Sequence, residues 1–156
     1  MKIENLDHLG LVAAIVDEIG LVELTDEFLP AHSLNHISPG QVVKAMILNG
    51  LGFVSAPLYL FSEFFEGKPV EHLLGSGITA SHLNDDRLGR VLDQVFEYGT
   101  TMFFLKVAMQ VAQRFGVRAS QCHLDSTSFA LDGESAMESE SAAPPESEGP
   151  QAIKIC

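Results

Sequence analysis

The stretch "HISPGQVVKAMILNGLGF", residues 36–53, carries the most apolar helical pattern in the chain. Ser38 stands where a helix N-cap is expected, and Pro39 follows at the first helical position, which suits its fixed φ and its missing N–H. Apolar residues then recur at helical spacing from Val42 to Leu51. We predict a helix here and expect it to lie at the centre of a hydrophobic core.

Two shorter helical patterns precede this stretch. The segment "DHLGLVAAIVDEI", residues 7–19, offers Asp7 as an N-cap and is followed by Gly20 as a C-terminal stop. The next segment, "LVELTDEFL", ends at Pro30, which cannot continue a helix. These signals predict a bent pair of helices.

Aromatic and aliphatic residues dominate the second half of the helical region. The run "LYLFSEFFEG" places Leu58, Phe61, Phe64 and Phe65 on one face, which we interpret as packing, and "PVEHLLG" predicts one more short turn of helix. The longest periodic stretch, residues 79–116, repeats apolar residues at three- and four-residue steps, including Phe96, Phe103, Val107 and Val111. Asn84 or Asp85 is the expected cap, and Gly99 is expected to break or kink this stretch.

The composition limits the class of protein. The 156 residues are 46 % hydrophobic, enough for one domain with a real core. The two cysteines form no Cys-x-x-Cys pair, which argues against a disulfide framework or a structural zinc site. The net charge of −12 makes the chain alone a poor binder of nucleic acid.

Nothing in the sequence predicts export or a membrane span. The N-terminus has no basic start followed by an apolar segment and a cleavage site. The apolar run from Val42 contains Lys44, Asn49 and Pro57, which a lipid-buried helix would tolerate poorly. We therefore expect a cytoplasmic protein without membrane contacts.

The period changes to two residues near the C-terminus. In "HLDSTSFALDGE", residues 123–134, side chains alternate as in a strand, which we expect over 121–131. Residues 133–151 are rich in Glu, Ser and Pro and predict a disordered acidic loop, and "AIKIC", residues 152–156, is again β-like. The predicted fold is mainly α: a helical domain over 1–118, then a truncated β-hairpin over 119–156.

Two groups of polar residues are candidates for chemistry. Asp125 on a strand is the type of oxygen ligand that Mg²⁺ takes, yet its local pattern favours a structural Asp that bonds its Ser and Thr neighbours. His123 is interpreted as a polar edge residue. In "LNDDRLGR" the pairing of Asp85 and Asp86 with Arg87 and Arg90 suggests a metal or phosphate site, but an ordinary capped helix start with local ion pairs fits better. No phosphate-cradling glycine loop is present.

The order of five segments resembles the bacterial insertion-sequence transposases of the DDE type, whose catalytic core is ribonuclease-H-like. The matching segments, at 6–21, 38–53, 58–65, 84–97 and 123–134, are "LDHLGLVAAIVDEIGL", "SPGQVVKAMILNGLGF", "LYLFSEFF", "NDDRLGRVLDQVFE" and "HLDSTSFALDGE". No single segment would suffice. The resemblance implies a helical N-terminal domain followed by the first strands of that core, with "AIKIC" as the start of a second strand.

The resemblance also implies a role for Asp125. It is similar to the first Asp of the DDE triad, a ligand of Mg²⁺ in a complete site. The second Asp and the Glu of the triad would lie beyond Cys156, and two-metal phosphoryl transfer needs several carboxylates. The expected function is that of a transposase N-terminal portion, inactive alone. Its expected partners are further copies or transposase subunits, with DNA bound only by the full-length parent. The alternative is a non-enzymatic helical interaction module that co-assembles with intact transposase.

Overall fold

The computed structural model describes residue 4 and residues 6–30, 36–52 and 56–117. These residues are mainly helical and contain no strand, which confirms the predicted mainly α fold for this part of the chain. The helices are α1 (Leu9–Ile19), α2 (Leu21–Phe28), α3 (Pro39–Gly50), α4 (Phe61–Phe64), α5 (Val70–Leu74), α6 (Asp85–Tyr98) and α7 (Thr100–Phe115), with the 3₁₀ turns η1 (Leu58–Leu60) and η2 (Ala80–His82). The predicted strands at 121–131 and 152–156 and the predicted loop at 133–151 lie outside the described residues.

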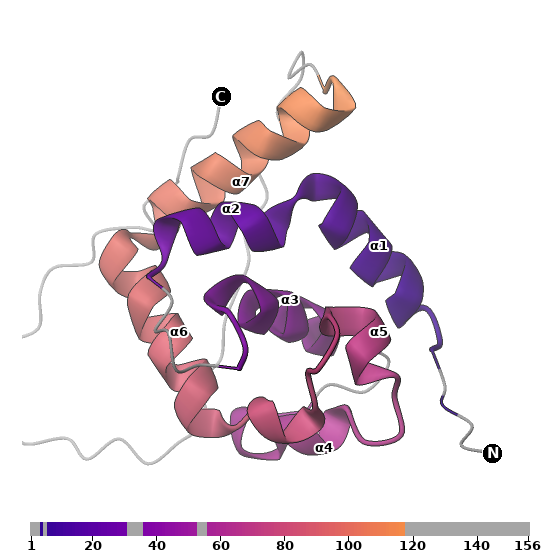
Figure 1. The fold of residues 1–156 in the computed structure, drawn as a ribbon. Helices are drawn as coiled ribbons and strands as arrows, with labels where there is room; N and C mark the ends of the chain where they lie inside the picture. The colour runs from indigo at the N-terminus through magenta and orange to yellow at the C-terminus, as the bar shows by residue number, and fades with distance from the viewer. Residues whose placement is uncertain (1–3, 5, 31–35, 53–55, 118–156) are drawn as a thin grey trace, which may run out of the picture. The chain divides into compact units, whose positions relative to one another are not determined.

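Helix α3 occupies the centre of the helical unit, as its apolar pattern predicts. Figure 1 shows α1, α2, α4, α5 and α6 arranged around it. On α3, Val42, Ala45 and Leu48 are completely buried, and they belong to one core cluster with residues of the surrounding helices. Leu51, at the C-terminal end of α3, is exposed instead.

The sequence signals for the starts of α3 and α6 are confirmed. The Ser38 hydroxyl accepts from the Gln41 N–H at 3.2 Å, and the Gln41 side chain accepts from the Ser38 N–H at 2.9 Å, which completes a capping box before Pro39. Asn84 caps α6 by accepting from the Arg87 N–H at 2.9 Å. Each cap satisfies backbone donors that the helix itself leaves unpaired.

The start of α1 differs from the prediction. Asp7 does not cap the helix, because it takes a left-handed conformation with φ of 52° one residue before the N-cap position, which His8 occupies. The His8 side chain does not cap the helix either; its Nε2 lies 2.8 Å from the carbonyl oxygen of Leu51. The entry to α1 is therefore fixed by a contact with the end of α3. The predicted stop at Gly20 is confirmed, with φ of 75°.

The predicted packing of the run from Leu58 to Phe65 is confirmed for three of its four residues. Phe61, Phe64 and Phe65 are buried, and the rings of Phe64 and Phe65 meet edge to face with centroids 4.9 Å apart. Leu58 is 42 % exposed, so its predicted place on the packed face is wrong. It lies in η1, where a tighter turn of three residues changes the phase of the side chains before α4 begins.

Gly99 separates α6 from α7, as predicted. Its φ of 100° is unfavourable for a residue with a side chain, so the continuous apolar pattern is divided into two helices. Leu88 and Val91 of α6 are buried. Phe96 is 77 % exposed, and none of the residues of α7 is buried, although the pattern continues through them.

Helices α2 and α3 approach each other closely at Gly40. A Cβ built on Gly40 would lie 2.3 Å from the Val22 carbonyl oxygen and 2.8 Å from the Val22 Cα, which are backbone atoms that cannot rotate away. The Gly40 N–H donates to the Asp26 carboxylate at 2.7 Å, which adds an anchor between the same two helices. The residue at position 40 must therefore lack a side chain.

Lys44 is a buried cation on the central helix. Its side chain is 4 % exposed, and its ammonium lies 2.5 Å from the Asp17 carboxylate of α1. Because a buried charge needs a partner, this ion pair links α3 to α1. The Lys that argued against a membrane span is thus a structural residue of the core.

Replacement by alanine should change stability in opposite directions at Gly40 and at Gly89. Gly40→Ala should destabilise the chain by about 1–3 kcal/mol, because the methyl group overlaps the α2 backbone. Gly89→Ala in α6 is the matched control: a Cβ there meets nothing within 4 Å, so alanine should stabilise by about 0.5–1 kcal/mol. Urea unfolding followed by circular dichroism measures both, and a Gly40→Ala variant as stable as the unmodified chain would contradict the packing.

Candidate functional site

The residues predicted for chemistry at the C-terminal end lie outside the described residues. This holds for Asp125, the predicted catalytic carboxylate and Mg²⁺ ligand, and for His123 beside it, so both roles stay predictions. Within the described part of the chain, no group of three or more His, Cys, Asp or Glu side chains is placed to hold a metal ion. The site must therefore be sought among other features of the helices.

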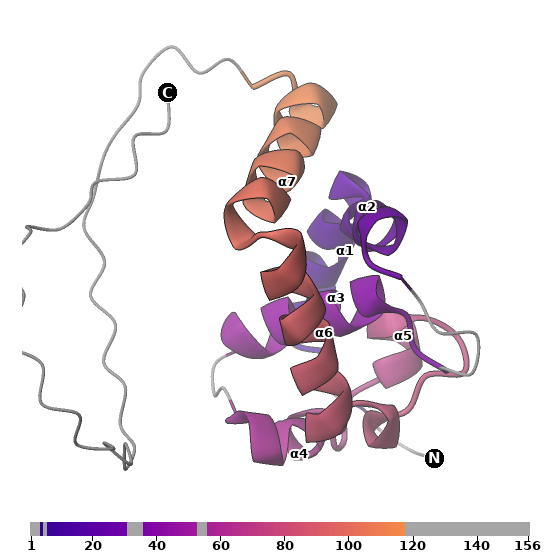
Figure 2. The same cartoon turned by 90° about the vertical axis from the view of Figure 1, so that its left-hand side faces the viewer.

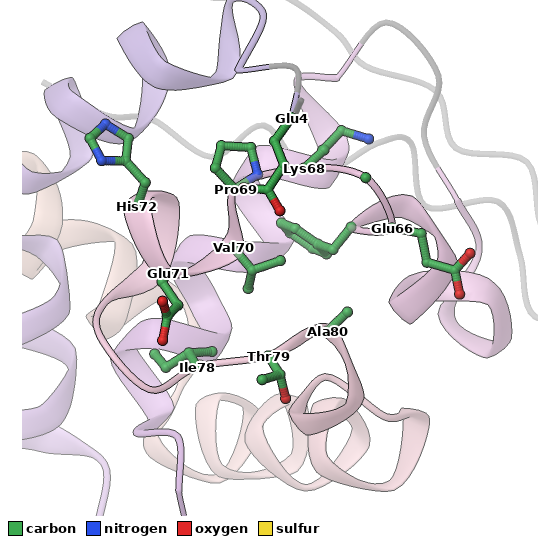
Figure 3. Close-up of a pocket in the computed structure, with 12 residues that line it drawn as sticks. Glu4, Glu66, Lys68, Pro69, Val70, Glu71, His72, Ile78, Thr79 and Ala80 are labelled. Carbon is green, nitrogen blue, oxygen red and sulfur yellow. The ribbon is translucent and has the colours of Figure 1, made fainter. Parts of the chain in front are cut away.

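A hollow of about 470 Å³ lies between the loop after α4, helix α5 and the turn before η2. Figure 3 shows Val70 near its middle, with Glu66 and His72 on opposite sides. Phe65 and Ile78, both buried, add to its apolar lining. Its charged side chains stand apart instead of converging on one point.

Local structure already uses the polar groups of this hollow. The Lys68 ammonium contacts the Phe64 carbonyl oxygen and lies 4.0 Å from the centroid of the Phe64 ring. The Glu71 carboxylate accepts from the Gly77 N–H at 2.9 Å. These contacts shape the loops around α5, and they leave no set of groups arranged for catalysis.

A stronger candidate is helix α7, in which three polar residues contact α1 or α2. Figure 2 shows α7 following α6 along one side of the unit, with α1 and α2 beside it. Lys106, Gln110 and Arg114 recur every four residues and so form one stripe. Lys106 lies 4.8 Å from the Phe28 ring centroid, Gln110 donates to the Ile19 carbonyl at 3.2 Å, and Arg114 lies 3.6 Å from the Glu18 carboxylate.

The other side of α7 is apolar and exposed. We call it the α7 apolar surface: Met102, Phe104, Leu105, Met109 and Phe115, which are between 39 % and 60 % exposed. A water-facing helix normally keeps its large apolar residues against the core, whereas α7 covers Phe103, Val107 and Val111 only partly and leaves these five exposed. Large apolar patches on a protein surface mark sites of contact with another surface.

Charge distinguishes α7 from the other long helices at the surface. It contains Lys106 and Arg114 and no acidic residue, whereas α1, α2 and α6 each carry more acidic than basic side chains. In a chain with a net charge of −12, this helix itself carries no anionic side chain. Another negatively charged protein surface meets the least repulsion there.

Sequence reasoning located α7 but missed its surface. The stretch is apolar on most of its circumference, and this pattern is typical of a buried helix. The signal that distinguishes the two cases is the four-residue spacing of Lys106, Gln110 and Arg114. Only the structure shows which apolar residues are covered: Phe103, Val107 and Val111 are partly buried, whereas the residues of the α7 apolar surface stay exposed. Among the described helices, none has the length and apolar character needed to cross a membrane.

Comparison with known proteins gives a family and no function. No curated protein and no solved structure matches the chain. Residues 1–109, which contain α1 to α6 and the first part of α7, match a family described as a domain of unknown function, DUF4277. Because this match covers more than half of the 156 residues, the chain belongs to the DUF4277 family.

Proposed function

We propose that the chain is the N-terminal portion of a DDE transposase, and that its helical unit makes protein contacts through the α7 apolar surface. In this proposal the portion has no activity alone and acts in the cytoplasm. Asp125 and the Mg²⁺ ions belong to the catalytic site of the complete parent, which also binds the DNA. The alternative, a free-standing helical module that co-assembles with intact transposase, uses the same surface.

The transposase part of the proposal is supported by the order of the five segments described above. Four of them, apart from residue 53 of the second, fall on described residues and contain helix: α1, α3, η1 with α4, and α6. The fifth carries Asp125 and lies outside the described residues. The DUF4277 match covers the same four segments, so they form part of one family domain.

The contact part of the proposal is carried by the exposure of the α7 apolar surface. Burying a Leu, Met or Phe side chain completely is worth about 1.5–3 kcal/mol, and these side chains are already partly covered. Two such surfaces together would contribute roughly 8–15 kcal/mol, against an association cost of about 4–15 kcal/mol. This balance favours a reversible contact of modest affinity.

A second copy of the helical unit is the partner that charge favours. Two copies of the full chain, each with a net charge of −12, repel each other. The repulsion is smallest where α7 meets α7, since neither helix carries an acidic residue. A contact between identical apolar patches is also self-complementary about a two-fold axis.

This contact predicts that one substitution abolishes association without unfolding the chain. Met109→Lys places a cation in the middle of the α7 apolar surface, and its exposed position makes the fold tolerant of the change. Leu51→Lys is the control, because residues 109 and 51 are similarly exposed, at 60 % and 58 %. Sedimentation equilibrium over a range of micromolar concentrations should show association of the unmodified chain and of Leu51→Lys, and a monomer for Met109→Lys.

Two results would oppose the self-contact. If Met109→Lys associates as strongly as the control, α7 is not part of the interface. A monomeric unmodified chain at every concentration would exclude a second copy as the partner. Circular dichroism of each variant verifies that the helical content is retained.

The transposase origin has a separate test in the genome. The DNA that follows the codon for Cys156, translated in all frames, should continue a ribonuclease-H-like sequence with a second Asp and a Glu. Unrelated sequence downstream would contradict the transposase proposal and favour the free-standing module. The result does not depend on the association measurement, so the two parts of the proposal can fail separately.

A further inference from the structure

A second hollow, of about 190 Å³, lies where the chain enters α6. Two stretches that are distant in the sequence line it: His36 with Ile37, and the stretch that carries Ser81 and His82 of η2 and Arg87 and Arg90 of α6. The side chains of the histidines and arginines are hydrogen-bond donors or cations. Such a concentration of donors is unusual in a chain with nine basic and 21 acidic residues.

The two histidines lie against each other although 46 positions separate them. Their rings are stacked, with centroids 5.3 Å apart and planes inclined by 14°. His82 Nδ1 accepts from the Thr79 N–H at 3.2 Å, so the proton of the neutral ring is on Nε2. His82 therefore presents a donor at its outer nitrogen.

Arg87 is held in place but incompletely paired. One terminal nitrogen of its guanidinium donates to the Ile37 carbonyl oxygen, and its Nε is buried without a hydrogen-bond partner. Burial lowers the pKa of Arg87, and the nearby Arg90 charge lowers it further. A buried guanidinium donor without a partner and a second cation nearby are both conditions that an anion would relieve.

Two acidic side chains oppose an anion at this position. Asp86 lies 3.7 Å from the Arg90 guanidinium and also accepts from Arg90 Nε through its backbone carbonyl at 3.0 Å. Asp85 bonds the Asp86 N–H at 2.9 Å, and Asn84 bonds the Arg87 N–H. The N–H groups of Asp86 and Arg87 are thus already used, and an anion would depend mainly on the side chains.

We propose that this hollow binds a tetrahedral oxyanion of the phosphate type. Phosphate oxygens accept hydrogen bonds from many directions, and the donors here come from two distant stretches around one small volume. The shared chemistry is one phosphate group, carried by a free anion or small molecule or by a nucleic-acid backbone. The high negative charge of the chain favours the small ligand. This site is separate from the α7 apolar surface and does not rest on it.

Arg90 gives the sharpest test, because its side chain is 69 % exposed and its loss should leave the fold intact. Inorganic phosphate is titrated into the full chain and observed by NMR shifts of the amides of residues 81–90, at constant ionic strength with chloride. We expect Arg90→Gln to weaken phosphate binding roughly tenfold, the usual effect of losing one charged hydrogen bond. Asp86→Asn should strengthen binding, since it removes the competing carboxylate.

Arg114→Gln is the matched control. Arg114 is also an exposed arginine on a helix, paired with Glu18 at 3.6 Å, but it lies on α7 outside the hollow. The Arg114→Gln variant should bind phosphate with the same affinity as the unmodified chain. If Arg90→Gln and Arg114→Gln weaken phosphate binding equally, the effect comes from the net charge of the chain, and the proposal is overturned.

A second arm distinguishes the source of the phosphate group. A short single-stranded oligonucleotide is titrated under the same conditions as inorganic phosphate. If the oligonucleotide binds more strongly than inorganic phosphate, and Arg90→Gln weakens this binding, the same site takes a nucleic-acid ligand. Binding of phosphate alone would assign a small ligand, and binding of neither probe would overturn the proposal.

Discussion

The backbone of α3 lies against the backbone of α2 at Gly40, and the rest of the helical unit depends on this approach. The absence of a side chain at position 40 allows the two helices to meet, and the bond from its N–H to Asp26 fixes their register. With α3 anchored in this way, its apolar side chains Val42, Ala45 and Leu48 lie in the interior. The buried Lys44 forms an ion pair with Asp17 of α1. A close backbone contact, more than any single side chain, thus places the central helix.

The same arrangement explains why α7 is left as a surface element. Within the part of the chain that the structure describes, the buried apolar residues precede Gly99, and α7 adds none to them. Gln110 and Arg114 contact α1, and the apolar residues of α7 are at most partly buried. The stability of the unit and its capacity for contact therefore belong to different helices. If the proposed self-contact forms, a substitution on α7 would change association without changing the fold.

The sequence predicted the helices well because their signals are local. Ser38 with Pro39, Asn84, Gly20 and Gly99 each act within one turn of the residues they affect, and each was identified correctly. The predicted cap at Asp7 is wrong because a contact from His8 to the end of α3 fixes the start of α1. The predicted packing of Leu58 is wrong because the 3₁₀ turn that contains it has a different helical period. The α7 apolar surface and the stacked His36 and His82 depend on how distant segments meet, which periodicity does not encode. The roles predicted for Asp125 and His123 lie outside the described residues.

The central claim is that the exposed apolar side of α7 is covered by a second copy. Amide hydrogen exchange measured at low and high chain concentration tests it directly, because covering the surface slows the local opening of that helix. Amides of residues 102–115 should exchange more slowly at high concentration, while those of α3 keep the same rates. Exchange in α7 that is the same at every concentration would contradict the claim.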